Sequence, residues 1–203
     1  MITVSGMATE KSATGTTPLN GVMIAAYRNS DPNTPVVTAM SDASGNYSLT
    51  ITTNGMALDG FVKATYGGVL DTYLYPPRPL VADFASASIF MVSANTLDLL
   101  SNLLCRNRQD LAKGVVAVLV SDAANAPVAG ATISSTPSLP KYCYNMGGNP
   151  NPDATMTDTD GIGYMLNLPA GEVTVTATKA GTTFSSHKVN ARAGVLTTTV
   201  IQP

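Results

Sequence analysis

The sequence predicts an all-β protein: two β-sandwiches in tandem, joined by one short amphipathic α-helix. Two observations support this fold class. Threonine and serine are abundant, with 26 Thr and 16 Ser among 203 residues, whereas Asp, Glu, Lys and Arg together make up only 12%. Residues of this kind form helices poorly and strands well. In addition, one ordered pair of motifs occurs twice, which indicates an internal repeat.

Each copy of the repeat contains a Pro-x-x-Gly motif and, after a strand, a Ser/Thr-Asp-x-x-Gly motif. The two motifs lie at 18–21 and 41–45 in the first half, and at 127–130 and 157–161 in the second half. A tyrosine follows the second motif in both halves. Because both motifs recur in the same order, we expect each half to be one copy of the same domain.

The motif residues are expected to form a structural turn: they are Asp42, Gly45, Tyr47, Asp158, Gly161 and Tyr164. The aspartates can cap the turn with their side chains, and the glycines supply the positive φ that the turn needs. The tyrosines should fill the core. An alternative is a calcium site at 158–161, but a single turn offers too few oxygen ligands. We therefore expect no metal and no other cofactor.

Short alternating runs between turn-forming residues predict the strands. In the first half these runs lie at 2–8, 21–28, 46–52, 61–66 and 88–92. In the second half the clearest runs lie at 114–120, 172–179 and 195–201. In the run at 172–179, apolar residues alternate with threonines, so one face of this strand is expected to be buried and the other exposed to solvent.

One helix is expected at 94–113, between a first sandwich at 1–93 and a second at 114–203. Its leucines recur at helical spacing: Leu97, Leu99, Leu100, Leu103, Leu104 and Leu111. Asn95 or Thr96 can cap its start, and Gly114 lies just past its end. The helix is either a linker that packs on the sandwiches or a docking helix whose leucines stay exposed.

The repeat resembles the carboxypeptidase regulatory-like domain, a prealbumin-like (transthyretin-like, CnaB-like) sandwich. The second half matches the family pattern at 127–131, at 157–161 and through a Leu-x-x-Gly stretch at 168–177; the first half matches only at 18–21 and 41–47. The resemblance implies a seven-stranded Greek-key sandwich in each half. For function it implies a stabilising or binding module rather than an enzyme.

Composition excludes several classes of function. The formal net charge of −2 argues against binding nucleic acid through its phosphates. No run of apolar residues is long enough to span a membrane. His187 is the only histidine, and no nucleophile motif surrounds it, so an enzyme is not expected.

Cys105 and Cys143 are either two free thiols or one disulfide, and the sequence leaves both open. Few Lys and Glu beside many Thr, Ser, Gly and Asn residues are typical of exported bacterial β-proteins. We therefore expect a secreted, periplasmic or cell-surface protein whose signal peptide is not part of this chain.

An insertion at 137–153 in the second half is the candidate binding site, because long loops on a rigid sandwich gather binding residues. Its aromatic and amide residues could hold a sugar or a peptide: Tyr142, Tyr144, Asn145, Asn149 and Asn151. The alternative is that the segment packs on its own domain. The sequence thus predicts a non-catalytic binding or scaffolding module of the bacterial envelope, with a polysaccharide or an envelope protein as partner. The alternative function is a spacer or stalk domain without a ligand.

Overall fold

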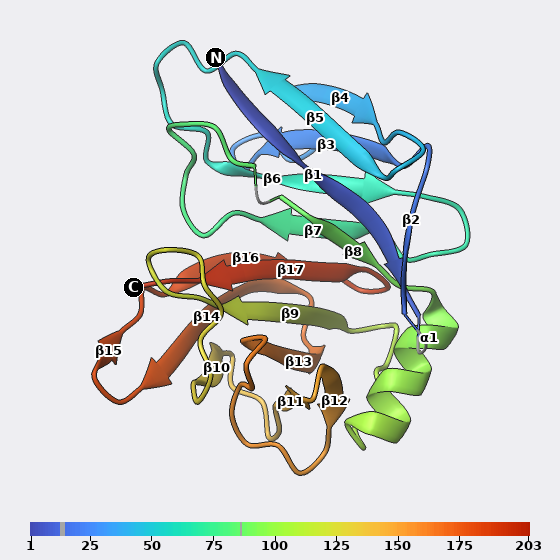
Figure 1. The fold of residues 1–203 in the computed structure, drawn as a ribbon, viewed down its shortest axis with the longest axis vertical. Helices are drawn as coiled ribbons and strands as arrows, with labels where there is room; N and C mark the ends of the chain where they lie inside the picture. The colour runs from blue at the N-terminus through green and yellow to red at the C-terminus, as the bar shows by residue number, and fades with distance from the viewer. Residues whose placement is uncertain (13–14, 86) are drawn as a thin grey trace. The chain divides into compact units, whose positions relative to one another are not determined.

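The computed structural model describes residues 1–12, 15–85 and 87–203, and its regular secondary structure consists almost entirely of strands (Figure 1). The chain divides into two compact units, Met1–Thr96 and Leu97–Pro203. Each unit contains two sheets. The predicted all-β fold class is therefore confirmed.

The first unit contains two four-stranded sheets. One contains β1 (Ile2–Lys11), β2 (Thr16–Pro18), β5 (Asn46–Ile51) and β8 (Ile89–Met91). In this sheet β1 runs antiparallel to β2 and β5, and parallel to β8. The other sheet has the order β7 (Thr72–Tyr75), β6 (Gly60–Thr65), β3 (Met23–Arg28), β4 (Val37–Met40).

Alternating side chains of these two sheets form one hydrophobic core. In β5 the side chains of Tyr47, Leu49 and Ile51 are buried, while the residues between them are exposed. Ile24 of β3 and Val62 of β6 belong to the same cluster. Because both sheets contribute one face to this cluster, the first unit is a β-sandwich.

The second unit also has two sheets. The larger one has the order β12 (Asn149–Asn151), β11 (Cys143–Met146), β13 (Ile162–Leu168), β9 (Gly114–Val120), β17 (Leu196–Ile201). The smaller one contains β10 (Thr132–Thr136), β14 (Gly171–Lys179), β15 (Thr182–Thr183) and β16 (His187–Ala191). In β14 the apolar residues are buried and the threonines between them are half-buried or exposed, as its alternation predicts.

All eight predicted strands are present, and the one at 114–120 has the predicted bounds. The strands that sequence reasoning did not predict are mostly short. They include β2 and β12, each three residues long, and β4 at the edge of its sheet. Such strands bury few residues, so their sequences show little alternation of apolar and polar residues.

The helix is shorter than predicted. It comprises α1 (Ala94–Leu99) and continues as a π-helical turn, η1 (Leu100–Leu104). Ser93 provides the cap, because its Oγ accepts a hydrogen bond from the backbone N–H of Thr96 at 3.1 Å. The predicted caps are wrong: Asn95 and Thr96 lie inside the helix, and Gly114 is the first residue of β9.

Among the described residues, no helix is both long and apolar enough to cross a membrane.

Candidate functional site

The two repeated motifs contact each other in the first unit. Ser41 Oγ donates a hydrogen bond to the carbonyl of Leu19 at 2.6 Å and accepts one from the N–H of Val22 at 2.9 Å. The backbone N–H of Gly21 also donates to the carbonyl of Ser41 at 2.9 Å. The Ser41 hydroxyl therefore fastens the Pro-x-x-Gly turn to the strand that precedes the aspartate turn.

The second unit repeats this contact. Thr157 Oγ1 donates to the carbonyl of Val128 at 2.7 Å and accepts from the N–H of Ala131 at 2.9 Å. The N–H of Gly130 donates to the carbonyl of Thr157 at 2.7 Å. In both halves, the hydroxyl of the first residue of the Ser/Thr-Asp-x-x-Gly motif therefore binds equivalent backbone groups of the Pro-x-x-Gly turn. We call this arrangement the hydroxyl clamp.

Asp42 caps the turn in the first unit. Its Oδ1 accepts hydrogen bonds from the N–H groups of Ser44 and Asn46, both at 2.9 Å. Gly45 has a φ of +79°, and a Cβ on it would lie 2.5 Å from the carbonyl oxygen of Ala8. Only glycine fits this position, because both the backbone conformation and the close contact exclude a side chain.

Asp158 uses its carboxylate differently. Its Oδ1 accepts from the N–H of Thr159, while its Oδ2 accepts from the N–H of Gly147, both at 2.8 Å. These hydrogen bonds lower the pKa of Asp158 below its usual value. The N–H of Ile162 is instead capped by Asp160 at 3.1 Å. The second copy therefore uses Asp158 to hold the tip of the inserted hairpin.

A third turn of this kind follows β9 and was not predicted. Asp122 Oδ1 accepts from the N–H groups of Ala124 and Ala126 at 2.8 and 2.9 Å. Asn125 takes the glycine position with a φ of +65°. The signal is present in the sequence, because Ser121 to Asn125 matches the motif once asparagine is accepted in place of glycine.

The insertion at 137–153 is a hairpin of β11 and β12 rather than an open loop. Tyr144 is 4% exposed, and its hydroxyl accepts from the N–H of Ile133 at 2.9 Å. Tyr142 is half-buried, and its hydroxyl accepts from the N–H of Ser135 at 3.1 Å. Ile133 and Ser135 lie in β10, an edge strand. The two phenols thus cover donors of an otherwise open edge.

The three asparagines of the insertion differ in exposure. Asn145 is 3% exposed; its Nδ2 donates to Asp160 Oδ2 at 2.7 Å, and its Oδ1 has no partner among the described residues. Asn151 is half-buried, and its Oδ1 accepts from the N–H of Asp153 at 2.9 Å. Asn149 is exposed. The structure therefore does not gather the five candidate side chains on one open surface.

A disulfide joins Cys105, which follows the π-helical turn, to Cys143 at the start of β11. Their Cα atoms are 5.7 Å apart. Next to this bond, Lys141 Nζ donates to the carbonyl of Cys105 at 2.8 Å. The hairpin and the end of the helix are thus linked covalently.

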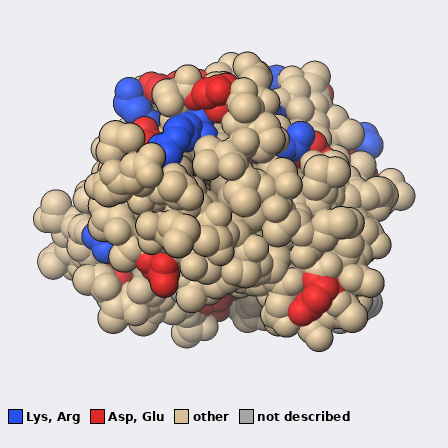
Figure 2. Space-filling view, turned by 90° about the horizontal axis from the view of Figure 1, so that it is seen from above, with Lys and Arg blue, Asp and Glu red and all other residues tan. Residues whose placement is uncertain are grey.

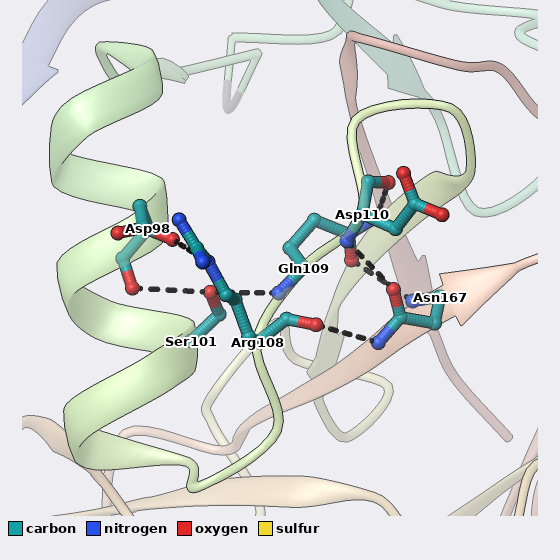
Figure 3. A network of polar contacts seen from close by, with 6 residues as sticks. All are labelled: Asp98, Ser101, Arg108, Gln109, Asp110 and Asn167. Carbon is teal, nitrogen blue, oxygen red and sulfur yellow. Dashed lines mark hydrogen bonds and ion pairs between the residues drawn. The ribbon is translucent and has the colours of Figure 1, made fainter.

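A polar network fixes the segment between the helix and β9 (Figure 3). Gln109 is buried; its backbone N–H donates to Ser101 Oγ at 3.0 Å, and its Oε1 accepts from the N–H of Asn167 at 2.9 Å. Asn167 Nδ2 donates to the carbonyl of Arg108 at 2.9 Å. Arg108 in turn forms an ion pair of 2.6 Å with Asp98. The helix is therefore held on β13 by side chains that sequence reasoning did not single out.

The single histidine of the chain lies beside a threonine hydroxyl. His187 Nδ1 of β16 lies 2.7 Å from Thr199 Oγ1 of β17. In the described part of the chain, no three or more His, Cys, Asp and Glu side chains could hold a metal ion together. Figure 2 shows one face of the molecule, where charged side chains are scattered among uncharged ones.

Tyr47 is 4% exposed and fills the core as predicted, whereas Tyr164 is only half-buried. The raised pKa values of these two tyrosines predict a loss of stability at alkaline pH. Burial raises the pKa of Tyr47, and it raises the pKa of Tyr164 to about 12 from the usual 10.0. Above pH 10 the unfolded chain loses these protons first, so the free energy of unfolding falls as pH rises from about 10 to about 12. Denaturant titrations at several pH values across this range measure the slope of the free energy of unfolding against pH. Tyr47→Phe should flatten it, and an equal slope in this variant would contradict the assignment.

Comparison with known proteins gives weak matches. No family model matches the sequence, and neither does any curated protein. Among solved structures, the minor pilin of Streptococcus agalactiae is 9% identical, with 100% of this chain and 95% of that chain covered and a TM-score of 0.33. The shaft pilin SpaA of Lactobacillus rhamnosus GG is 13% identical, with 100% and 97% covered and a TM-score of 0.29.

The Bacillus anthracis TIE protein is 14% identical, with a TM-score of 0.32 and 99% of this chain covered. This chain spans only 34% of that protein, about a third of its length. At TM-scores this low, the three matches establish neither a shared fold nor a shared function.

Proposed function

We propose that this chain is a non-catalytic structural spacer of an exported bacterial protein, built from two copies of a carboxypeptidase regulatory-like, prealbumin-like sandwich. The repeat is supported by the hydroxyl clamp, which forms around Ser41 and Thr157 with equivalent backbone partners. A spacer needs a stable fold but no metal centre, which agrees with the low charge and with the absence of a metal-holding group of side chains among the described residues.

One observation carries the proposal: the aromatic residues of the insertion hold their own domain together. The hydroxyls of Tyr142 and Tyr144 accept hydrogen bonds from two N–H groups of the edge strand β10. A buried phenol in this position adds no contact area for a sugar or a peptide. The two hydroxyls do occupy N–H groups of β10 to which a strand of another chain could otherwise bind, so they protect this edge against association.

Export is supported by the disulfide between Cys105 and Cys143, because disulfides persist in oxidising compartments. A linked helix and hairpin, with the Gln109 network beside them, would also keep the second unit stiff outside the cell.

The test combines a binding assay with a stability measurement. The purified chain should stay in the supernatant when it is mixed with peptidoglycan or insoluble polysaccharides. Tyr142→Phe with Tyr144→Phe keeps both rings but removes the hydroxyls, and should lower the free energy of unfolding by about 1–3 kcal/mol. Saturable binding that is lost in Asn149→Ala with Asn151→Ala, at unchanged stability, would overturn the spacer and favour a carbohydrate-binding module.

A second candidate is a protein-binding module, favoured by leucines near the helix that remain exposed. Leu99, Leu103 and Leu111 are 38%, 61% and 46% exposed. Single exposed leucines are ordinary on protein surfaces, but three close in sequence form a candidate contact. Sedimentation of the wild type beside Leu99→Glu with Leu103→Glu separates the two functions. Self-association that disappears in the variant would favour this candidate over the spacer.

A further inference from the structure

The chain contains two Asn-Gly pairs, Asn20–Gly21 and Asn54–Gly55, and both asparagines are exposed. This dipeptide is prone to loss of the side-chain amide, because glycine places no Cβ near the backbone nitrogen that attacks the asparagine side chain. The two pairs have the same chemistry. Their different backbone environments therefore decide which of them reacts in the folded protein.

In the first pair the attacking nitrogen is held in place. The N–H of Gly21 donates to the carbonyl of Ser41 at 2.9 Å, inside the hydroxyl clamp. The neighbouring residues Leu19 and Val22 are bound to Ser41 Oγ and are themselves buried. Attack by this nitrogen would require the whole clamp to open.

In the second pair the attacking nitrogen is free of such contacts. Asn54 and Gly55 have φ values of +51° and +79°, and the N–H of Met56 donates to the carbonyl of Thr53 at 3.0 Å. This geometry is that of a two-residue type I′ turn. The N–H of Gly55 has no hydrogen-bond partner among the described residues, and a Cβ on Gly55 would meet nothing within 4 Å. Only one hydrogen bond has to open for this turn to rearrange.

We propose that Asn54 is a spontaneous modification site, at which the side-chain amide is converted to a carboxylate. The deprotonated nitrogen of Gly55 attacks Asn54 Cγ, a C–N bond forms, and ammonia leaves with the proton that it needs. Water then opens the resulting cyclic imide at either carbonyl, which yields aspartate or isoaspartate at position 54. The only co-reactant is water, and each event makes the net charge of −2 more negative by one.

The expected difference between the two sites follows from the bonds that must break. A reaction that requires one hydrogen bond to open is slowed by about tenfold, because the net free energy of a hydrogen bond is about 1 kcal/mol and this adds to the reaction barrier. Asn20 requires several such bonds to open, so Asn54 should react at least about tenfold faster in the folded chain. In the unfolded chain this difference should vanish.

The experiment incubates the full oxidised chain in mildly alkaline buffer and follows a mass increase of about 1 Da by peptide mapping. Trypsin separates the sites, because Lys11, Arg28 and Lys63 bracket them in two different peptides. Asn54→Gln should abolish the fast modification, whereas Asn20→Gln should leave it unchanged. A reduced chain in denaturant provides the unfolded reference.

Two results would overturn the proposal. One is modification of Asn20 as fast as that of Asn54 in the folded chain. The other is an unmodified Asn54 in the folded chain under conditions in which both sites react in denaturant. Because the readout is the mass of defined peptides, neither the spacer nor the protein-binding function has to hold for the test to decide.

Discussion

Replacing Thr157 by valine is expected to lower the free energy of unfolding of the second unit by about 2–5 kcal/mol. Valine keeps the shape of threonine but lacks the hydroxyl. Without it, the carbonyl of Val128 and the N–H of Ala131 lose their partners at a position that is only 2% exposed. A buried polar group left unpaired costs about 1–3 kcal/mol, and two groups are affected here.

Chemical denaturation of the wild type and the variant measures this loss. Thr155→Val is the matched control, because Thr155 is exposed on the same segment and should change stability by less than about 0.5 kcal/mol. Ser41→Ala should produce a similar loss in the first unit, since Ser41 is 4% exposed and has the equivalent partners. A Thr157→Val variant as stable as the Thr155→Val control would show that the hydroxyl clamp is not a source of stability.

The motif turns could be predicted from the sequence because the interactions that form a turn are local. A glycine with positive φ and an aspartate that caps its own turn depend on a few neighbouring residues, so the turn at 41–45 could be recognised without a structure. The alternation in β14 is equally local. What the motif could not show is that Ser41 and Thr157 reach across to the other motif, because that contact joins residues about twenty to thirty positions apart.

The end of the helix and the burial of the insertion depend on contacts distant in sequence. The leucine spacing continues to Leu111, but the helix ends at Leu104, where Cys105 is bonded to Cys143 and Arg106 has a φ of +48°. The tyrosines of the insertion looked like ligand-binding residues because aromatic side chains in a long loop usually have no other partner. Their partners are N–H groups of β10, and an open strand edge is not visible in a sequence.

Removing the disulfide is expected to lower the free energy of unfolding of the second unit by about 4 kcal/mol. Cys105 and Cys143 are 38 positions apart, so the bond restricts a long segment of the unfolded chain. Closure of a loop of this length corresponds to about that free energy at 25 °C. In the folded state the bond also positions the hairpin whose tyrosines cover β10.

The measurement compares thermal unfolding of the oxidised chain, the reduced chain and Cys105→Ala with Cys143→Ala. The reduced chain and the variant should unfold at similar, lower temperatures, and reductant should have no further effect on the variant. The first unit contains neither cysteine, so its transition should not move. An oxidised and a reduced chain with the same transition would mean that the hairpin is held by its hydrogen bonds alone. Lys141 and the tyrosines would then hold the hairpin in place without the covalent bond.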